Sequence, residues 1–152
     1  MSLKVQNEFL LFLKMQSQGG EAIQVTRTPM EAGIPQESPD GKLLYYGRGW
    51  PFAMSVWRIP VEGGEESKIL DSVHPDGLWT LRHEGIYFFT APDEKGSSDL
   101  CLFEFSGGEI MKILRIERRL FGKLAVSPDG RTILYSQWDE VGSDLMLVEN
   151  FR

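Results

Sequence analysis

A repeat of about 44 residues constrains this 152-residue chain more than any other feature of its sequence. Paired glycines occur at Gly19–Gly20, Gly63–Gly64 and Gly107–Gly108, and successive pairs are 44 residues apart both times. The tetrapeptide Ser-Pro-Asp-Gly occurs at Ser38–Gly41 and again 89 residues later, two repeats on, at Ser127–Gly130. A period of about 40–50 residues is typical of folds that repeat one supersecondary unit. The repeat therefore predicts an array of similar units along the whole chain.

Each repeat contains several short apolar runs separated by turn residues. One run precedes each glycine pair, at Phe9–Leu13, Val56–Val61 and Leu100–Phe105. Others follow the Asp-Gly turns, as at Leu43–Tyr46 and Ile133–Tyr135. Short apolar runs bounded by Gly, Pro and Asp are typical of β-strands. Because these runs are continuous and do not alternate with polar residues, the strands are expected to be buried on both faces. The sequence therefore predicts an all-β fold.

We expect four strands, A to D, in each complete repeat. In the first they are predicted near Ile34–Glu37, Lys42–Tyr46, Ser55–Val61 and Glu66–Leu70. In the second they are predicted near Leu78–Arg82, Ile86–Thr90, Asp99–Phe105 and Glu109–Ile116. The last repeat provides only strands A to C, near Lys123–Val126, Arg131–Gln137 and Leu145–Glu149.

The chain begins with the end of an earlier repeat. A C-like run lies at Glu8–Lys14 and a D-like run at Ala22–Thr26. An α-helix over Glu8–Met15 is the alternative for the first run, because no β-branched residue occurs there. We interpret the chain as one domain with segments 1–26, 27–70, 71–116 and 117–152.

Eight residues are expected to hold the turns of the repeat. They are Ser38, Asp40, Gly41, Gly64, Gly108, Ser127, Asp129 and Gly130. In such turns proline sets φ to about −65°, aspartate tolerates the tight geometry, and glycine supplies a positive φ. Asp40 and Asp129 hold equivalent turn positions, so we interpret them as structural and not as a catalytic carboxylate pair.

At these residues the sequence resembles the WD40-like or TolB-like β-propeller repeat, whose hallmark is Ser-Pro-Asp-Gly followed by an apolar strand. The segment Trp57–Glu65 is similar to the C strand and C–D turn of that repeat, and Gly142–Phe151 is similar to the end of such proteins in bacteria. The resemblance implies four-stranded antiparallel blades. About three and a quarter blades are present, which implies a partial propeller, the C-terminal portion of a longer protein or half of a six-bladed ring.

Composition excludes several classes of partner and cofactor. The net charge of −6 and the pI of about 5.0 argue against nucleic acid. No apolar run approaches the roughly 20 residues of a membrane span, and the start of the chain lacks the features of a signal peptide. A bacterial periplasmic and a cytoplasmic location both stay open. The single cysteine, Cys101, lies in an apolar run and is expected to be a buried thiol.

No catalytic or cofactor motif is found in the sequence. The Gly-x-Ser-x-Gly elbow of serine hydrolases is absent, and only His74 and His83 offer an imidazole. Neither zinc-ligand spacing nor a Walker or dinucleotide glycine motif occurs. We therefore expect no catalysis by this chain, no metal and no cofactor.

The predicted binding residues lie in B–C loops and D–A connections, which emerge at one end of a blade. They are Trp50, Phe52, His74, Arg115, Arg118, Arg119 and Trp138. Tryptophan and arginine are favoured anchors of protein interfaces. The alternative for Trp50 and Trp138 is that they cap the core locally, whereas Trp57 and Trp79 fall within strands and are expected in the core.

The leading functional hypothesis is a non-catalytic scaffold that binds a protein or peptide partner through this loop end. The alternative is an accessory propeller of a prolyl-oligopeptidase-like hydrolase whose catalytic domain is absent from this chain. A homodimer is also predicted, in which the D-like segment Ala22–Thr26 of each copy completes the last blade of the other and removes an open strand edge.

Overall fold

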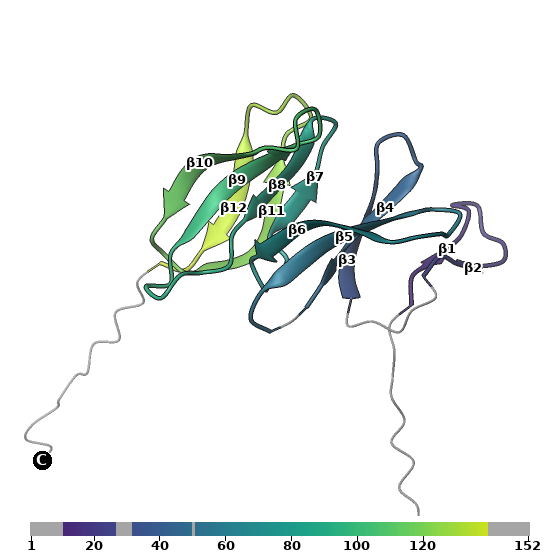
Figure 1. Cartoon of the computed structure of the whole chain (residues 1–152), viewed down its shortest axis with the longest axis horizontal. Helices are drawn as coiled ribbons and strands as arrows, with labels where there is room; N and C mark the ends of the chain where they lie inside the picture. The colour runs from purple at the N-terminus through teal and green to yellow at the C-terminus, as the bar shows by residue number, and fades with distance from the viewer. Residues whose placement is uncertain (1–10, 27–31, 50, 140–152) are drawn as a thin grey trace, which may run out of the picture.

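The computed structural model of the protein describes residues 11–26, 32–49 and 51–139 (Figure 1). These residues form β-strands and the turns between them, with no helix among them, so the expected all-β fold is confirmed. It follows that this part of the chain holds no apolar helix of membrane-spanning length.

Two four-stranded antiparallel sheets form the centre of the fold, and each connects its strands in chain order. The first contains β3 (Ala32–Glu37), β4 (Leu43–Arg48), β5 (Met54–Pro60) and β6 (Ser67–Val73). The second contains β7 (Trp79–Leu81), β8 (Gly85–Phe89), β9 (Ser98–Glu104) and β10 (Ile110–Ile116). Each sheet corresponds to one predicted complete repeat, and all eight strands overlap their predicted ranges.

Two-stranded antiparallel sheets lie at either end of the described chain. β1 (Leu13–Lys14) pairs with β2 (Ile23–Gln24), and β11 (Leu120–Val126) pairs with β12 (Ile133–Gln137). The strand at Leu13–Lys14 favours the strand interpretation of the first apolar run over the helix. The predicted strand Leu145–Glu149 lies outside the described residues.

Strand β11 begins three residues earlier than the sequence pattern indicated. Leu120 pairs with Gln137, and the register then shifts before Leu124 pairs with Tyr135. Gly122 lies in the shifted stretch with φ of 95°, a conformation that glycine adopts without strain. The strand therefore continues through an irregularity that a pattern of apolar residues does not reveal.

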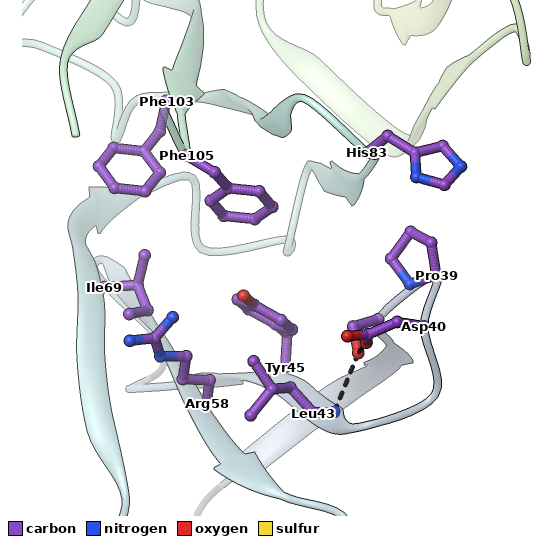
Figure 2. Close-up of a pocket in the computed structure, with 10 residues that line it drawn as sticks. Pro39, Asp40, Leu43, Tyr45, Arg58, Ile69, His83, Phe103 and Phe105 are labelled. Carbon is purple, nitrogen blue, oxygen red and sulfur yellow. Dashed lines mark hydrogen bonds between the residues drawn. The ribbon is translucent and has the colours of Figure 1, made fainter. Parts of the chain in front are cut away.

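The two Ser-Pro-Asp-Gly turns share one hydrogen-bond pattern. In the first, the Ser38 hydroxyl donates to Asp40 Oδ1 at 2.6 Å and accepts from the Leu43 N–H at 2.9 Å, the bond drawn in Figure 2. In the second, the corresponding distances from Ser127 Oγ are 2.5 Å to Asp129 Oδ1 and 3.0 Å to the Thr132 nitrogen.

Each turn aspartate is also held by the backbone, since the N–H two residues on donates to Oδ1 at 3.1 Å in both turns. The serine hydroxyl, followed by this backbone N–H, lowers the pKa of Asp40 and of Asp129 below the ordinary aspartate value. Both carboxylates therefore stabilise a turn, as the equivalence of the two motifs predicted.

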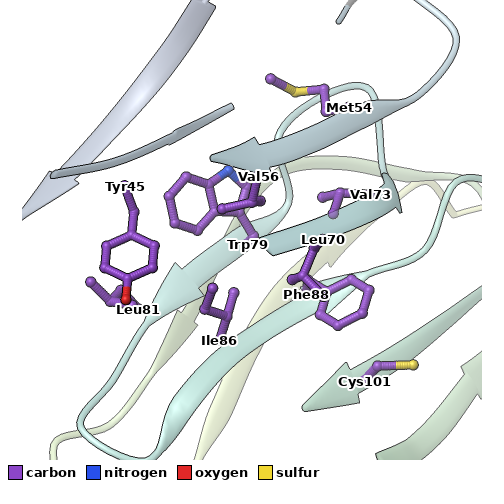
Figure 3. Close-up of a cluster of buried hydrophobic side chains, with 10 residues drawn as sticks. All are labelled: Tyr45, Met54, Val56, Leu70, Val73, Trp79, Leu81, Ile86, Phe88 and Cys101. Carbon is purple, nitrogen blue, oxygen red and sulfur yellow. The ribbon is translucent and has the colours of Figure 1, made fainter. Parts of the chain in front are cut away.

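Three apolar clusters join the four sheets in chain order. Val25, Tyr46 and Ile59 pack between the β1–β2 sheet and the first four-stranded sheet. A larger cluster, shown in Figure 3, fills the space between the two four-stranded sheets. Its members are Tyr45, Met54, Val56, Leu70, Val73, Trp79, Leu81, Ile86, Phe88 and Cys101. The third joins the second four-stranded sheet to β11–β12 and contains Leu78, Tyr87, Phe89, Leu100, Leu102, Ile116, Leu120, Leu124 and Val126.

Alternate side chains of one strand therefore enter different clusters, which accounts for the continuous apolar runs in the sequence. Every residue of β8 is buried: Ile86 and Phe88 face the first four-stranded sheet, whereas Tyr87 and Phe89 face β11–β12. Cys101 is buried as expected, and desolvation raises the pKa of its thiol.

The first strands of successive sheets lie beside one another. The Gln36 side chain on β3 donates to the Trp79 carbonyl at 3.2 Å and accepts from the Leu81 N–H at 2.9 Å, so it joins β3 to β7. Ile34 has φ of 59°, which β-branched residues rarely adopt, and a Cβ built on Gly77 would lie 1.7 Å from its Cδ1. The absence of a side chain at Gly77 therefore leaves the space that the Ile34 side chain fills.

We expect Gly41→Ala to lower the free energy of unfolding by about 1–2 kcal/mol, because Gly41 has φ of 71° and an L-residue is strained there. Crowding is not the cause, since the nearest atom to a Cβ at Gly41 would be 3.5 Å away. Gly107→Ala is the control: its backbone is not in the left-handed region and its Cβ would also meet only an ordinary contact. Urea denaturation of both variants measures the difference, and equal stabilities would contradict the assignment.

Candidate functional site

Phe52, His74, Arg118, Arg119 and Trp138, five of the predicted binding residues, lie in or next to connections that meet at one end of the sheets. In an antiparallel sheet with strands in chain order, alternate connections lie at the same end, which places the β4–β5 and β6–β7 connections together. Backbone bonds from His74 N to Phe89 O at 2.8 Å and from Trp138 N to Arg119 O at 2.8 Å join the ends of neighbouring elements. We call this end the loop face; it comprises 49 and 51–53, 74–77, 91–97, 117–119 and 138–139.

Two aromatic residues predicted for this face are exposed on it. Phe52, between β4 and β5, is 86 % exposed. Trp138, at the end of β12, is 50 % exposed, and its ring lies 5.7 Å from that of Phe121 between centroids. Phe121, which is also exposed, was missed by sequence reasoning because it follows Leu120 in a segment not expected to be a strand. Trp50 lies outside the described residues.

His74 has a structural position in the connection between β6 and β7. Its side chain is buried, and its Nδ1 accepts a hydrogen bond from the Asp76 N–H at 3.2 Å. Burial lowers the pKa of the imidazole; the nearby Asp76 carboxylate opposes this and the Arg119 guanidinium adds to it. A neutral imidazole therefore shapes the loop, and little of its surface is offered to a ligand.

The three predicted arginines differ in their surroundings. Arg115 lies on β10 and pairs with Asp93 and, at 3.3 Å, with Asp99. Arg118 donates to Asp139 at 2.8 Å in an exposed ion pair, and such pairs contribute little to stability. Arg119 is exposed, and its carbonyl accepts the Trp138 N–H. The structure thus brings Arg118 and Arg119 to the Phe121–Trp138 aromatic pair and places Arg115 in an ion-pair network on β10.

A pocket of about 520 Å³ lies at the opposite end, between the two four-stranded sheets (Figure 2). We call it the inter-sheet pocket. It is lined by Ser38, Pro39, Asp40, Leu43, Tyr45, Arg58, Ile69, His83, Phe103 and Phe105. Sequence reasoning treated Ser38 and Asp40 as turn residues, considered His83 only as an imidazole, and singled out none of the aromatic lining residues. Its two walls come from different repeats, and sequence alone does not show which side chains of two repeats face each other.

The described residues contain no group of three or more His, Cys, Asp or Glu side chains placed to hold a metal ion. Comparisons with known proteins do not assign the chain to a family: a scan against protein-family models finds no match, and a search of curated proteins also finds none. The candidate sites therefore rest on their own geometry.

We expect His74 to make the protein less stable as the pH falls below about 6.5. The unfolded chain binds a proton at the ordinary histidine pKa, whereas the folded protein binds it only at a lower pH, so the free energy of unfolding decreases between these two values. His74→Asn supplies an acceptor oxygen for the Asp76 N–H without titrating, and should flatten this dependence between pH 7.5 and 5.5.

Urea denaturation across this pH range tests the His74 prediction. His83→Asn is the matched control for the substitution, because His83 is exposed at the other end of the sheet. A His74→Asn protein with the same pH dependence as the parent protein would refute the prediction.

Proposed function

We propose that this chain is a series of β-propeller blades that serves as a non-catalytic binding module, and that it takes a protein or peptide partner on the loop face. Each four-stranded sheet is one blade in this proposal, with β3, β7 and β11 as successive inner strands. The β1–β2 and β11–β12 sheets are parts of the adjacent blades.

The packing of the sheets supports the propeller arrangement. Blades of a propeller bury both faces against their neighbours around a common channel. Here both four-stranded sheets are covered on each face by apolar clusters. Residues of β3, β7 and β11 also line one hollow of about 510 Å³, which includes Gln36, Thr80 and Lys123. Inner strands that converge on one space are what a propeller channel requires.

The aromatic pair Phe121–Trp138 is the observation that carries the binding proposal. Both rings stand about half exposed, at 56 % and 50 %; the Trp138 N–H donates to the Arg119 carbonyl, and Arg118 forms an ion pair with Asp139, the residue after Trp138. Leaving two large aromatic surfaces in water forgoes the stabilisation of burying them, whereas a partner recovers it. Tryptophan and arginine at the centre of an interface contribute a large share of its affinity.

Peptides selected from a random phage-displayed library on the immobilised protein test this proposal. Selected peptides should bind Trp138→Ala about 30-fold more weakly than the parent protein, the loss expected when a hot-spot side chain worth about 2 kcal/mol is removed. Met111→Ala is the matched control, because Met111 is also 50 % exposed but lies on strand β10. Peptides that bind both variants as tightly as the parent protein would exclude the loop face.

The predicted homodimer stays a prediction, and exposed apolar side chains at both ends of the sheet series support it. Leu13 and Ile23 are 62 % and 69 % exposed on β1–β2, and Leu134 is 66 % exposed on β12. A second copy that covers these faces would shield them from water. Light scattering at micromolar concentration should give twice 17.3 kDa, whereas a mass of 17.3 kDa would exclude the dimer.

A further inference from the structure

The inter-sheet pocket has an apolar body formed by both of its walls. Tyr45 and Leu43 on β4 form one wall with Ile69, and Phe103 and Phe105 at the end of β9 form the other. The Phe105 ring lies 5.9 Å from the Tyr45 ring and 6.0 Å from the Phe103 ring between centroids. Pockets of this size and lining hold small organic groups, and its aromatic walls suit a flat or branched apolar one.

Two polar groups on the first wall have unused hydrogen-bonding capacity. Arg58 donates its Nε–H to Ser67 Oγ at 3.1 Å, and no carboxylate within the described ranges forms an ion pair with its guanidinium. Tyr45 is only 3 % exposed, yet its hydroxyl has no hydrogen-bond partner in the described part of the chain. The Tyr45 hydroxyl is not among the fully buried unpartnered atoms, so it reaches the space of the pocket, where it can donate to a ligand acceptor.

These two side chains are neighbours on one face of the sheet. Tyr45 and Arg58 are directly paired across β4 and β5. Figure 2 shows the Arg58 guanidinium beside Ile69, and the Tyr45 hydroxyl directed to the same side of the pocket below the phenylalanine rings. One anionic group at this side can therefore accept hydrogen bonds from both.

The Asp40 carboxylate on the other side of the pocket repels an anion and so sets the orientation of the ligand. Asp40 and His83 lie there, across the rings from Arg58 (Figure 2). Asp40 is held ionised by the turn, because its Oδ1 accepts from the Ser38 hydroxyl and the Lys42 N–H. An anionic ligand therefore has its charge at the Arg58 side and its apolar part between the aromatic walls.

In the second repeat, the residues equivalent to Arg58 and Tyr45 pack or form hydrogen bonds within the protein. Leu102 is 44 residues after Arg58 and pairs with Tyr87 across β8 and β9, as Arg58 pairs with Tyr45. Leu102 is buried in the apolar core, and the Tyr87 hydroxyl donates to Glu84 Oε1 at 3.0 Å. The second repeat thus has neither a free cation nor an unpaired tyrosine hydroxyl at this position.

We propose that the inter-sheet pocket binds a carboxylate attached to a large apolar group, with Arg58 and Tyr45 as the carboxylate ligands. Such a group is the C-terminal residue of a peptide that ends in an aromatic side chain, or a free aromatic carboxylic acid. This site lies at the opposite end of the sheets from the loop face, so it is independent of partner binding there.

Titration of the whole chain with N-acetyl-L-phenylalanine and with its C-terminal amide tests the proposal by calorimetry or nuclear magnetic resonance. The acid should bind about tenfold more tightly than the amide, as expected from charge-assisted hydrogen bonds. Arg58→Leu reproduces the residue of the next repeat and should abolish this preference. Tyr45→Phe, which keeps the ring, should reduce it.

Arg131→Leu is the control for Arg58→Leu, since Arg131 is an exposed arginine outside the pocket, and it should keep the preference for the acid. Comparison of acid and amide on the parent protein needs no variant and is therefore independent of any folding defect. Equal binding of the two, no binding of either at millimolar concentration, or an unchanged preference in a folded Arg58→Leu protein would each overturn the proposal.

A pentapeptide that ends in phenylalanine identifies the source of the carboxylate. Tighter binding of this peptide than of N-acetyl-L-phenylalanine supports the site and assigns it to peptide C-termini. Equal or weaker binding, with the acid preference intact, supports the site and assigns it to small aromatic acids.

Discussion

Burial of both faces of the central strands is the constraint on which the rest of this structure depends. In β4, Tyr46 enters the cluster shared with β1–β2 while Tyr45 enters the cluster shared with the second four-stranded sheet. A sheet with two apolar faces needs a covering layer on each side, because either face left open would lose the free energy of burying its aromatic side chains. One such sheet therefore requires a neighbour on both sides, and repetition of the unit follows from this requirement.

The two candidate binding sites lie where this face-to-face packing ends. At the loop end, Phe121 and Trp138 follow the last pair of the β11–β12 ladder, Leu120 with Gln137, and are half exposed. At the turn end, the two central sheets leave space between Tyr45 and the phenylalanines of β9, which is the inter-sheet pocket. The middle of the interface offers no such room, since Val56, Val73 and Ile86 are fully buried there.

The sequence predicted the fold more completely than the sites, for a physical reason. Turn residues act locally: the serine, aspartate and glycine of each Ser-Pro-Asp-Gly turn bond to one another, so the motif identifies them without knowledge of the rest of the chain. The pocket depends on which side chains of two repeats face each other, and pairing of Phe105 with Tyr45 is a long-range contact. Likewise, nothing local to His74 reveals that its imidazole would be buried against its own loop.

Positions at which the two repeats carry different residues are therefore more informative about binding than positions at which they agree. Positions that both repeats fill in the same way, such as the rings of Tyr45 and Tyr87, serve the shared packing. Position 58 breaks this equivalence, because the buried leucine of the next repeat is replaced by an arginine that no described carboxylate neutralises. Arg58 is half-buried and its bond to Ser67 is exposed, so its guanidinium stays in contact with water, whereas the equivalent Leu102 is buried in the core. An accessible guanidinium beside aromatic rings is the feature that the proposed carboxylate site would use.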